Sequence, residues 1–241
     1  MSRTIVVTGG GTGIGRAVAL RFAEAGDAVV VTGRRPAPLK ETVAASGDRI
    51  RALECDGADP DQLRRLLEQL PERVDVLVNN AGGNTDFDRA EPDSLESLSQ
   101  QWQANFTANV LTTVLTTQAL ADRLVDHGSV ISIGSIAAEF GAGAYGAAKA
   151  ALATWNISAA TDLGARGITA NVVAPGYIAD TEFFRDQLTP ERRAHLIGST
   201  KNGRVGQPSD VAETVFFLAS AGARHITGQI LHLNGGARTT R

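Results

Sequence analysis

The sequence predicts an α/β fold in which a doubly wound parallel sheet of about seven strands forms a single domain, residues 1–241. Two patterns predict this fold. Short runs of β-branched residues alternate with longer amphipathic stretches along the whole chain, and Gly, Asp and Pro separate them. Most of the short runs are apolar at consecutive positions, as strands covered by helices on both faces are.

The elements follow in order along the chain. Strands are expected at the β-branched runs, 5–7, 28–32, 50–53, 74–78, 130–133, 168–173 and 230–233. Helices are expected at the amphipathic stretches near 14–26, 60–70, 96–126, 145–165 and 209–220. The last helix begins at Pro208-Ser209-Asp210, a favourable helix start. No linker or internal repeat interrupts this alternation, which supports one domain.

The composition excludes several classes of protein. Of the 241 residues 43% are hydrophobic and 20% charged, and the net charge is −3 without any basic run. This argues against nonspecific binding of nucleic acid or of an anionic membrane. No apolar stretch has the length of a signal peptide or a membrane span, so we expect a cytoplasmic protein. Cys55 is the only cysteine and the four histidines lie far apart, so we expect no metal site.

A glycine-rich turn follows the first predicted strand. It reads Thr8-Gly9-Gly10-Gly11-Thr12-Gly13-Ile14-Gly15 and leads into the predicted helix. Glycine permits positive φ and lets the backbone approach a pyrophosphate, and the N–H groups at a helix N-terminus attract negative charge. An ordinary glycine-rich turn would look similar, but the order of strand, turn and helix favours a dinucleotide site.

The second predicted strand ends in Thr32-Gly33-Arg34-Arg35. NAD-specific sites place an Asp or Glu at this point to hold the ribose 2′-hydroxyl, and this chain has none there. Two guanidinium groups can instead pair with a 2′-phosphate. The sequence therefore predicts NADP(H) as the cofactor. The alternative is a basic turn in solvent, which applies to Arg35 more than to Arg34.

The reacting groups are expected at Ser135, Tyr145 and Lys149. Residues i and i+4 share one face of a helix, and a chain with only two tyrosines and three lysines rarely shows this spacing by chance. A free phenol titrates at about 10, whereas a proton donor works best near the operating pH. A neighbouring ammonium and a cationic nicotinamide favour the phenolate, so we expect a lowered pKa for Tyr145. Taken singly, each residue also fits a structural role.

These motifs carry a resemblance to the short-chain dehydrogenase/reductase family over essentially the whole chain. The matching residues are Thr8-Gly-x-x-x-Gly13-x-Gly15, Asp56, Asn79-Asn80-Ala81-Gly82, Trp102 with Asn109, Ser135, Tyr145-x-x-x-Lys149, Pro175-Gly176, Thr227-Gly228-Gln229 and Gly235-Gly236. The resemblance implies a Rossmann fold and an oxidoreductase. Asn79 and Gly82 also fit a role in bracing the end of the sheet.

The resemblance also assigns roles to residues. It implies that Tyr145 is the acid/base, that Ser135 polarises a carbonyl, that Lys149 binds the nicotinamide ribose, and that Asn109 holds a water in a proton relay. The cofactor-binding residues would be Gly9, Thr12, Gly13, Ile14 and Gly15 at the phosphates, Arg34 and Arg35 at the 2′-phosphate, Asp56 and Gly57 at the adenine, Asn80, Ala81 and Gly82 at the adenosine ribose, and Pro175, Gly176 and Ile178 at the carboxamide.

Within the family, the chain is similar to 3-oxoacyl-carrier-protein reductases at the strand before Ser135 and in the runs 166–169 and 203–206. Of the two arginines with which those enzymes bind a carrier protein, Arg166 is matched and the other is replaced by Asp126. An acidic carrier protein would be repelled by Asp126, so carrier-protein dependence is doubtful. The interval from Ser135 to Tyr145 is also three residues shorter than is common in that subgroup.

Residues 180–203 are expected to form a substrate lid, in which Phe183, Phe184 and Leu188 could cover an apolar substrate or pack on the sheet or a neighbouring subunit. The resemblance implies a homotetramer formed through the long helices. The leading functional hypothesis is an NADPH-dependent reductase of a 3-oxoacyl thioester or related small ketone. The alternatives are an NAD(H)-dependent alcohol dehydrogenase and a noncatalytic NADP(H)-sensing protein.

Overall fold

The computed structural model of the chain describes residues 2–239, and within them seven strands form one parallel sheet in the order β3-β2-β1-β4-β5-β6-β7. The strands are β1 (Thr4–Thr8), β2 (Ala28–Gly33), β3 (Ile50–Glu54), β4 (Val74–Asn79), β5 (Leu124–Ile133), β6 (Thr169–Pro175) and β7 (Ile230–Leu233). The chain runs outward from β1 to β3 and then crosses back to β4. The strand order therefore reverses between β1 and β4, where ligands of such sheets bind at the carboxyl ends.

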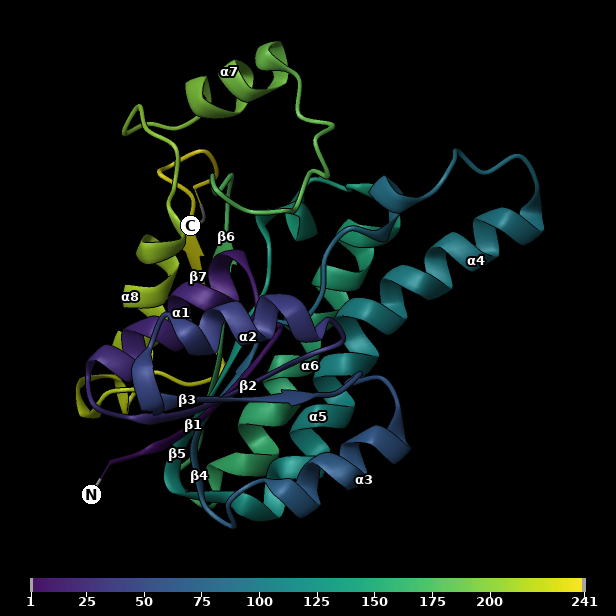
Figure 1. Cartoon of the computed structure of the whole chain (residues 1–241). Coiled ribbons are helices and arrows are strands. Elements are labelled where there is room, and N and C mark those ends of the chain that lie inside the picture. Colours follow the sequence, from purple (N-terminus) through teal and green to yellow (C-terminus); the bar gives the residue numbers. More distant parts are fainter. Residues whose placement is uncertain (1, 240–241) are drawn as a thin grey trace.

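Helices cover both faces of the sheet (Figure 1). The α-helices are α1 (Gly13–Glu24), α2 (Pro36–Ala44), α3 (Pro60–Gln69), α4 (Leu95–Phe106), α5 (Thr112–Leu120), α6 (Gly143–Gly164), α7 (Pro190–Gly198) and α8 (Pro208–Leu218). Short 3-10 turns occur at η1 (Gly47–Arg49), η2 (Thr85–Asp88), η4 (Ala121–Arg123), η5 (Ile136–Glu139) and η6 (Ala221–Ala223).

The alternation of side chains along β1 divides the core into two layers. Ile5 and Val7 point to one face of the sheet, where they pack with residues of α1, α2 and α8. Val6 points to the other face and packs with residues of α3, α5 and α6. Successive side chains of a strand point to opposite faces, so a strand buried on both sides is apolar at every position. The predicted doubly wound sheet is confirmed.

Several boundaries differ from the predicted ones. The helix predicted over 96–126 consists of α4, a π-helical turn η3 (Thr107–Leu111) and α5, and the chain enters β5 at Leu124. The strand predicted at 130–133 therefore begins six positions earlier, because Asp126-His127-Gly128, which resembles a turn, is accommodated in it. His127 takes a φ of 62°, and the pairing of β4 with β5 shifts register between Val74 and Val76. Such an irregularity lets a strand absorb an extra residue.

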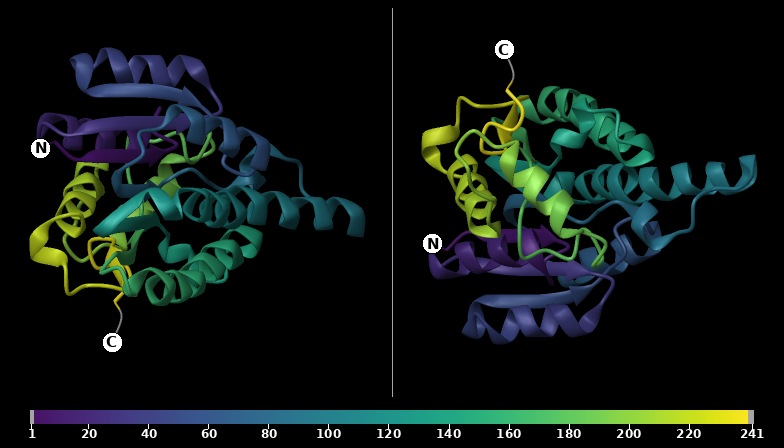
Figure 2. Two further views of the ribbon diagram at one scale, coloured as in Figure 1. Left: turned by 90° about the horizontal axis from the view of Figure 1, so that it is seen from below. Right: turned by 90° about the horizontal axis from the view of Figure 1, so that it is seen from above.

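The segment 180–203, which contains α7, arches over the carboxyl ends of the strands (Figure 1). At its base, Ile178 pairs with Gly206 in an isolated parallel bridge, and the Arg204–Asp210 ion pair ties the returning chain to the start of α8. Figure 2 shows α7 lying over the sheet when the molecule is seen from above, and α4 projecting beyond the other elements. Among the described residues, no helix combines the length and the apolar character that a membrane crossing requires.

Candidate active site

A cavity of about 1200 Å³ lies at the carboxyl ends of the strands and extends under the segment 180–203. Most of the candidate site residues line it. They are Gly9, Thr12, Gly13, Ile14, Arg34, Arg35, Asp56, Gly57, Asn80, Ala81, Gly82, Ser135, Tyr145, Lys149, Pro175, Gly176 and Ile178. Gly15 and Asn109 lie behind this surface. The fold thus brings residues that follow six strands, β1 to β6, together into one elongated site.

The glycine turn between β1 and α1 is shaped by close backbone packing. Gly9 and Gly13 take positive φ values of 64° and 50°, which side chains rarely adopt. A Cβ at Gly15 would overlap the carbonyl oxygen of Gly9, so Gly15 permits contact between helix and turn. The Asn80 amide donates to the carbonyl oxygens of Thr8 and Gly9, at 3.1 and 3.0 Å. Asn80 therefore holds the turn in place from β4.

The N-terminus of α1 opens into the cavity. Its N-cap residue is Thr12, whose side chain makes no capping hydrogen bond within the described residues. The first N–H groups of a helix lack partners inside the helix, and together with the helix dipole they attract an anion. The open glycine turn and the uncapped helix end therefore fit the pyrophosphate of a dinucleotide.

At the far end of the cavity, two arginines follow β2. Arg34 and Arg35 are both exposed, and the Arg35 guanidinium pairs with the Glu182 carboxylate at 2.5 Å between Nη2 and Oε2. Asp56 follows β3, where its carboxylate accepts a hydrogen bond from the Ala58 amide at 3.0 Å. The rim of this end thus carries two guanidinium groups, as the sequence indicates.

Near Asp56 the cavity is closed by α5. A Cβ at Gly57 would lie 2.7 Å from the hydroxyl oxygen of Thr116 and 2.9 Å from a methyl carbon of Thr112. Glycine at this position therefore lets the chain after β3 pack closely against the helix. This close approach forms the floor on which a flat group could rest beside Asp56.

Ser135, Tyr145 and Lys149 meet at the opposite end of the cavity. Ser135 follows β5 and caps η5, with its hydroxyl accepting from the Ala137 amide at 3.1 Å. Tyr145 and Lys149 lie in the first two turns of α6, and both are buried. The Ser135 hydroxyl lies close enough to Tyr145 to lower the pKa of the phenol, and Lys149 Nζ lies 5.9 Å from the centre of the Tyr145 ring.

Burial is the largest influence on the pKa values of Tyr145 and Lys149. It raises the pKa of Tyr145 to about 12, an effect that the hydrogen bond from Ser135 partly offsets. Burial also lowers the pKa of Lys149 from 10.5 to about 8. The sequence predicts a lowered pKa for Tyr145, but among the protein's own groups desolvation of the phenolate is the larger effect. The ammonium of Lys149 is turned toward the carbonyl oxygen of Ile133, to which it donates at 2.8 Å.

Asn109 lies in the π-helical turn η3, a type of distortion that often occurs at functional sites. Its amide donates to the carbonyl oxygens of Gly83 and Asn105, each at 2.9 Å, and its Oδ1 accepts from the Gly83 amide at 3.0 Å. These bonds brace the loop after β4. The relay implied by the resemblance would join Asn109 to Lys149, but the hydrogen bonds of the two side chains lead to different backbone groups.

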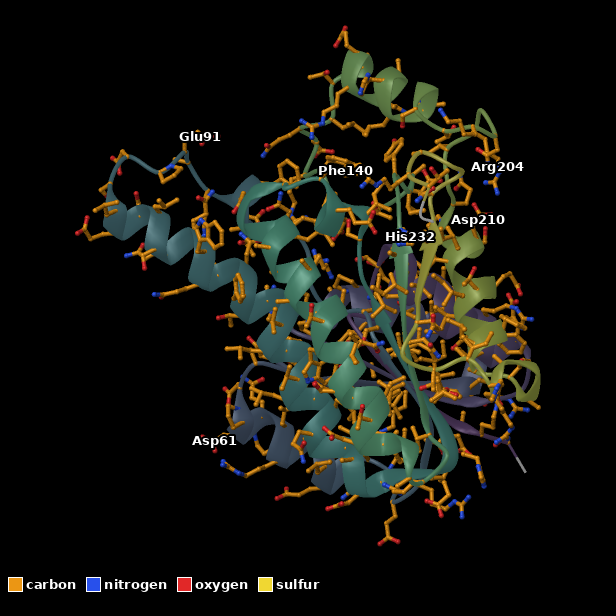
Figure 3. All side chains as sticks on the ribbon, turned by 180° about the vertical axis from the view of Figure 1, so that it is seen from behind. Asp61, Glu91, Phe140, Arg204, Asp210 and His232 are labelled. Atoms are coloured by element: carbon orange, nitrogen blue, oxygen red, sulfur yellow. The ribbon has the colours of Figure 1, made fainter. Side chains whose placement is uncertain are left out.

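Sequence reasoning overlooked the bonds of Glu139, which lies between Ser135 and Tyr145 along the chain. Its carboxylate accepts from His232 Nε2 at 3.0 Å and from Arg238 Nε at 2.9 Å. These bonds tie the connection between Ser135 and Tyr145 to β7 and to the chain that follows it. Phe140 and His232 lie toward the end of the molecule that carries α7 (Figure 3). Arg238 and Glu139 are 99 positions apart, so no local pattern could have indicated the pair.

Sequence reasoning also missed Phe87 and Asp88, which lie in η2 and line the same cavity. They contact the segment 180–203, and no motif marks them in the sequence. Across residues 2–239, the structure holds no cluster of three or more His, Cys, Asp or Glu side chains suited to a metal ion.

Comparison with known proteins gives consistent matches along the chain. A family model described as enoyl-(acyl carrier protein) reductase matches residues 9–238. The BbsD subunit of a hydroxy(phenyl)methylsuccinyl-CoA dehydrogenase from Thauera aromatica is 35% identical, covering 98% of this chain and 96% of the relative. The 3-oxoacyl-(acyl-carrier-protein) reductase of Escherichia coli is 34% identical, covering 96% and 95%.

A solved structure agrees with these matches. The crystal structure of a blue fluorescent protein from a metagenomic library, in complex with NADPH, has a TM-score of 0.84 and 35% sequence identity to this chain, and the match covers 98% of both. The family model and the curated relatives span nearly the whole sequence. The chain therefore belongs to the short-chain dehydrogenase/reductase family, whose members are oxidoreductases that bind nicotinamide cofactors.

Proposed function

We propose that this protein is an NADPH-dependent oxidoreductase that reduces a ketone to an alcohol and can run in reverse. The observation that carries the proposal is the meeting of Ser135, Tyr145 and Lys149 at one end of the cavity that begins at the glycine turn. An elongated site with an anion-binding helix end at one side and a proton donor at the other suits a dinucleotide and a small carbonyl compound.

When bound, the cofactor supplies a hydride, so that NADPH is oxidised to NADP⁺ while the carbonyl carbon is reduced. The Ser135 hydroxyl holds the carbonyl oxygen, and Tyr145 transfers its phenolic proton to that oxygen as the C=O π bond breaks. A phenol with a pKa of about 12 is fully protonated at neutral pH and ready to donate. Lys149, with a pKa of about 8, is then mostly an ammonium that stabilises the phenolate left behind.

The remaining residues of the cavity would hold the cofactor. The turn Gly9, Thr12, Gly13 and Ile14, shaped by Gly15, would bind the pyrophosphate. Asp56 and Gly57 would border the adenine, the backbone of Asn80, Ala81 and Gly82 would pass the adenosine ribose, and Pro175, Gly176 and Ile178 would contact the carboxamide. Asn109 would act on this machinery by bracing the loop after β4 through Gly83.

Arg34 and Arg35 support NADP(H) over NAD(H). Both guanidinium groups lie at the rim of the cavity, directly after β2. Neither position carries the Asp or Glu that an NAD-specific site would have there. The two guanidinium groups can donate charge-assisted hydrogen bonds to a 2′-phosphate. They offer no hydrogen-bond acceptor to a 2′-hydroxyl. The blue fluorescent protein that resembles this chain binds NADPH, which agrees with this choice.

The substrate would be a 3-oxoacyl thioester or a related ketone that is not delivered by a carrier protein. The names of two relatives indicate thioester substrates, a coenzyme A ester for one and an acyl-carrier-protein ester for the other. Here Arg166 donates to Asp126 at 3.0 Å and to the carbonyl oxygens of Ala121 and Leu124. The one arginine left for docking a carrier protein is thus already engaged within the chain.

Residues 180–203 would form the lid over the substrate, and the protein would work as a cytoplasmic homotetramer built through α4, α5 and α6. A lid at this position excludes water from the reacting groups and can open to release the product. Of these assignments, the homotetramer follows from the family resemblance.

The test is to follow NADPH oxidation with an acetoacetyl thioester and several simple ketones, and to repeat each assay with NADH. The proposal predicts turnover with NADPH and a kcat/KM about 10- to 100-fold lower with NADH, the loss expected from one or two charge-assisted bonds. Turnover that prefers NADH would instead favour the alcohol dehydrogenase. Tight NADPH binding without turnover of any ketone would favour the sensing protein.

A further inference from the structure

Five aromatic side chains surround the reacting end of the cavity. The Phe183 ring lies between the others, with its centre 5.5 Å from that of Tyr145, 5.7 Å from that of Phe87 and 5.0 Å from that of Phe184. Phe87 and Tyr177 each pack against Phe184 as well, at 5.6 and 5.9 Å. Three of these pairs meet edge to face, at interplanar angles of 69° to 86°, the arrangement that aromatic quadrupoles favour, and the other two are tilted at 56° and 58°.

Phe183 occupies a position that belongs to the substrate. A carbonyl compound bound to the hydroxyls of Ser135 and Tyr145 must lie against the Tyr145 ring, and Phe183 is the aromatic side chain from the segment 180–203 that packs there. Phe87 and Phe184 also pack against each other, at 5.6 Å, so together they form one aromatic wall on which the Phe183 ring rests while it also contacts Tyr145. A space that fits the phenyl group of Phe183 fits a phenyl group of the same size on a ligand.

Apart from these aromatic contacts, the interactions that hold Phe183 in this position are at the surface. Arg185 pairs with Asp88 at 2.9 and 3.1 Å, and the Gln187 amide donates to the carbonyl oxygen of Phe87 at 2.7 Å. The Arg185 and Asp88 side chains are 38% and 51% exposed, and such pairs contribute little to stability. Arg185 and Asp186 also have φ values of 48° and 61°, which strains this segment. A ligand whose ring takes over the aromatic contacts of Phe183 can therefore displace this side chain at small net cost.

We propose that the site takes ketones in which the carbonyl carbon carries an aromatic ring, and that this ring replaces the Phe183 side chain against the wall formed by Phe87 and Phe184. The inference rests on the proposed reductase function and names its substrate class. On binding, the substrate ring takes over the edge-to-face contacts of Phe183, while its carbonyl oxygen reaches the hydroxyls of Ser135 and Tyr145. The hydride and proton transfers are those of the proposed reaction, and the product is a secondary benzylic alcohol.

The experiment compares three methyl ketones with the same number of carbon atoms: acetophenone, cyclohexyl methyl ketone and hexyl methyl ketone. With saturating NADPH, kcat/KM for acetophenone should exceed that for hexyl methyl ketone by about tenfold or more, the discrimination that one or two aromatic pairs supply. Cyclohexyl methyl ketone, which has a ring without π electrons, should fall between them. Equal values for acetophenone and hexyl methyl ketone would overturn the inference.

Two variants test the role of Phe87, which would contact the substrate ring, separately from that of Phe183, which the substrate ring would displace. Phe87→Leu should lower kcat/KM for acetophenone by about fivefold or more through KM and change the value for hexyl methyl ketone by less than about twofold. Phe183→Ala should lower KM for acetophenone, because the substrate no longer has to displace a side chain. The matched control is Phe217→Leu, an exposed phenylalanine on α8, which should change neither. A similar effect of Phe87→Leu on both ketones, or a raised KM in Phe183→Ala, would contradict the proposal.

A binding measurement keeps this inference distinct from the reductase function. Calorimetry on Tyr145→Phe protein with saturating NADPH measures the affinity for each ketone without turnover. If no ketone is reduced but acetophenone still binds more tightly than hexyl methyl ketone and Phe87→Leu removes the difference, the aromatic site is real and the reductase function fails. If ketones are reduced but both bind equally, the reductase function stands and the aromatic site is wrong.

Discussion

The side chains of Arg35 and Glu182 form an ion pair across the mouth of the cavity, with 2.5 Å between Nη2 and Oε2. Arg35 follows β2 at the proposed position of the 2′-phosphate, and Glu182 lies in the segment 180–203. A carboxylate and a phosphate bind the same guanidinium group in the same geometry. The Glu182 carboxylate therefore competes with the cofactor for Arg35, which couples cofactor binding to the position of this segment.

Replacing Glu182 by Gln should strengthen NADPH binding. Both partners are more than half exposed, 61% and 54%, so their pair contributes at most about 1 kcal/mol and its loss should lower the NADPH Kd by about two- to fivefold. The NADH Kd should not change, because NADH has no 2′-phosphate. Fluorescence titration with each cofactor measures both. Glu213→Gln, which removes the partner of Arg21 elsewhere on the surface, is the control. An equal gain for NADH would show that Glu182 acts in another way.

Replacing Arg34 by Ala should have the opposite effect on the same titration. Its guanidinium is proposed to bind the 2′-phosphate, and hydrogen bonds to a charged group contribute about 1.5–3 kcal/mol. NADPH affinity should therefore fall by about 10- to 100-fold while NADH affinity stays within about twofold. The loss for NADPH should also shrink at high salt, because the contact is at the surface. Unchanged NADPH affinity would mean that Arg34 only faces solvent.

Gly15 and Gly164 both lie in helices but should respond in opposite ways to Ala. A Cβ at Gly15 would overlap the Gly9 carbonyl oxygen and contact the Asn80 amide, so Gly15→Ala should lower the free energy of unfolding by about 1–3 kcal/mol. A Cβ at Gly164 has open space around it, so Gly164→Ala should raise the free energy by about 0.5–1 kcal/mol. Urea denaturation of both variants checks the pair. Similar stabilities would show that the glycine turn tolerates a side chain.

Replacing Lys149 by Met should stabilise the protein while abolishing its activity. Burial lowers the pKa of Lys149 from 10.5 to about 8, so the folded state disfavours the ammonium by about 3 kcal/mol at most. Removing this group loses one hydrogen bond to the Ile133 carbonyl oxygen, which leaves an expected gain of about 1–3 kcal/mol at neutral pH. Thermal or urea denaturation at neutral pH measures the gain. A destabilised variant would show that the ammonium is favourably held.

The same pKa sets the pH dependence of stability. Between about 8 and 10.5 the unfolded chain keeps the Lys149 proton and the folded protein releases it, so this group makes the free energy of unfolding rise with pH. NMR titration of labelled lysine side chains reports the ionisation directly, since the chain has only three lysines. One resonance should titrate near about 8 and be missing from Lys149→Met. Three lysines that titrate alike would contradict this explanation.

Most of the sheet could be predicted from the sequence because its central strands are buried on both faces and carry apolar residues at consecutive positions. The helix α2 could not, since Pro36-Ala37-Pro38 looks like a turn. Pro36 nevertheless occupies the first helical position, where the missing N–H is no loss and the ring fixes a suitable φ. α7 also escaped prediction, because Thr189 caps a short helix whose residues are all at least partly exposed, so no apolar face marks it.

Some features of the candidate site could likewise be predicted from the sequence, and others could not. Tyr145, Lys149 and the glycine turn follow local spacing that chemistry requires, so the sequence indicates them and the structure brings them to one cavity. Phe87 reaches Phe183 and Phe184 from a loop nearly a hundred positions away, and only the fold creates those contacts. The pKa of Tyr145 likewise depends on how far the phenol is buried, which spacing cannot indicate.

The most direct test of this account is the effect of Tyr145→Phe on turnover and on cofactor binding in the same preparation. The variant removes only the hydroxyl that is proposed to donate the proton and leaves the ring against Phe183 in place. We predict that kcat/KM for ketone reduction falls by about 10²–10⁴-fold, the contribution of a positioned general acid, while the NADPH Kd stays within about threefold. A variant that retains most of its turnover would contradict the assignment of Tyr145 as the proton donor.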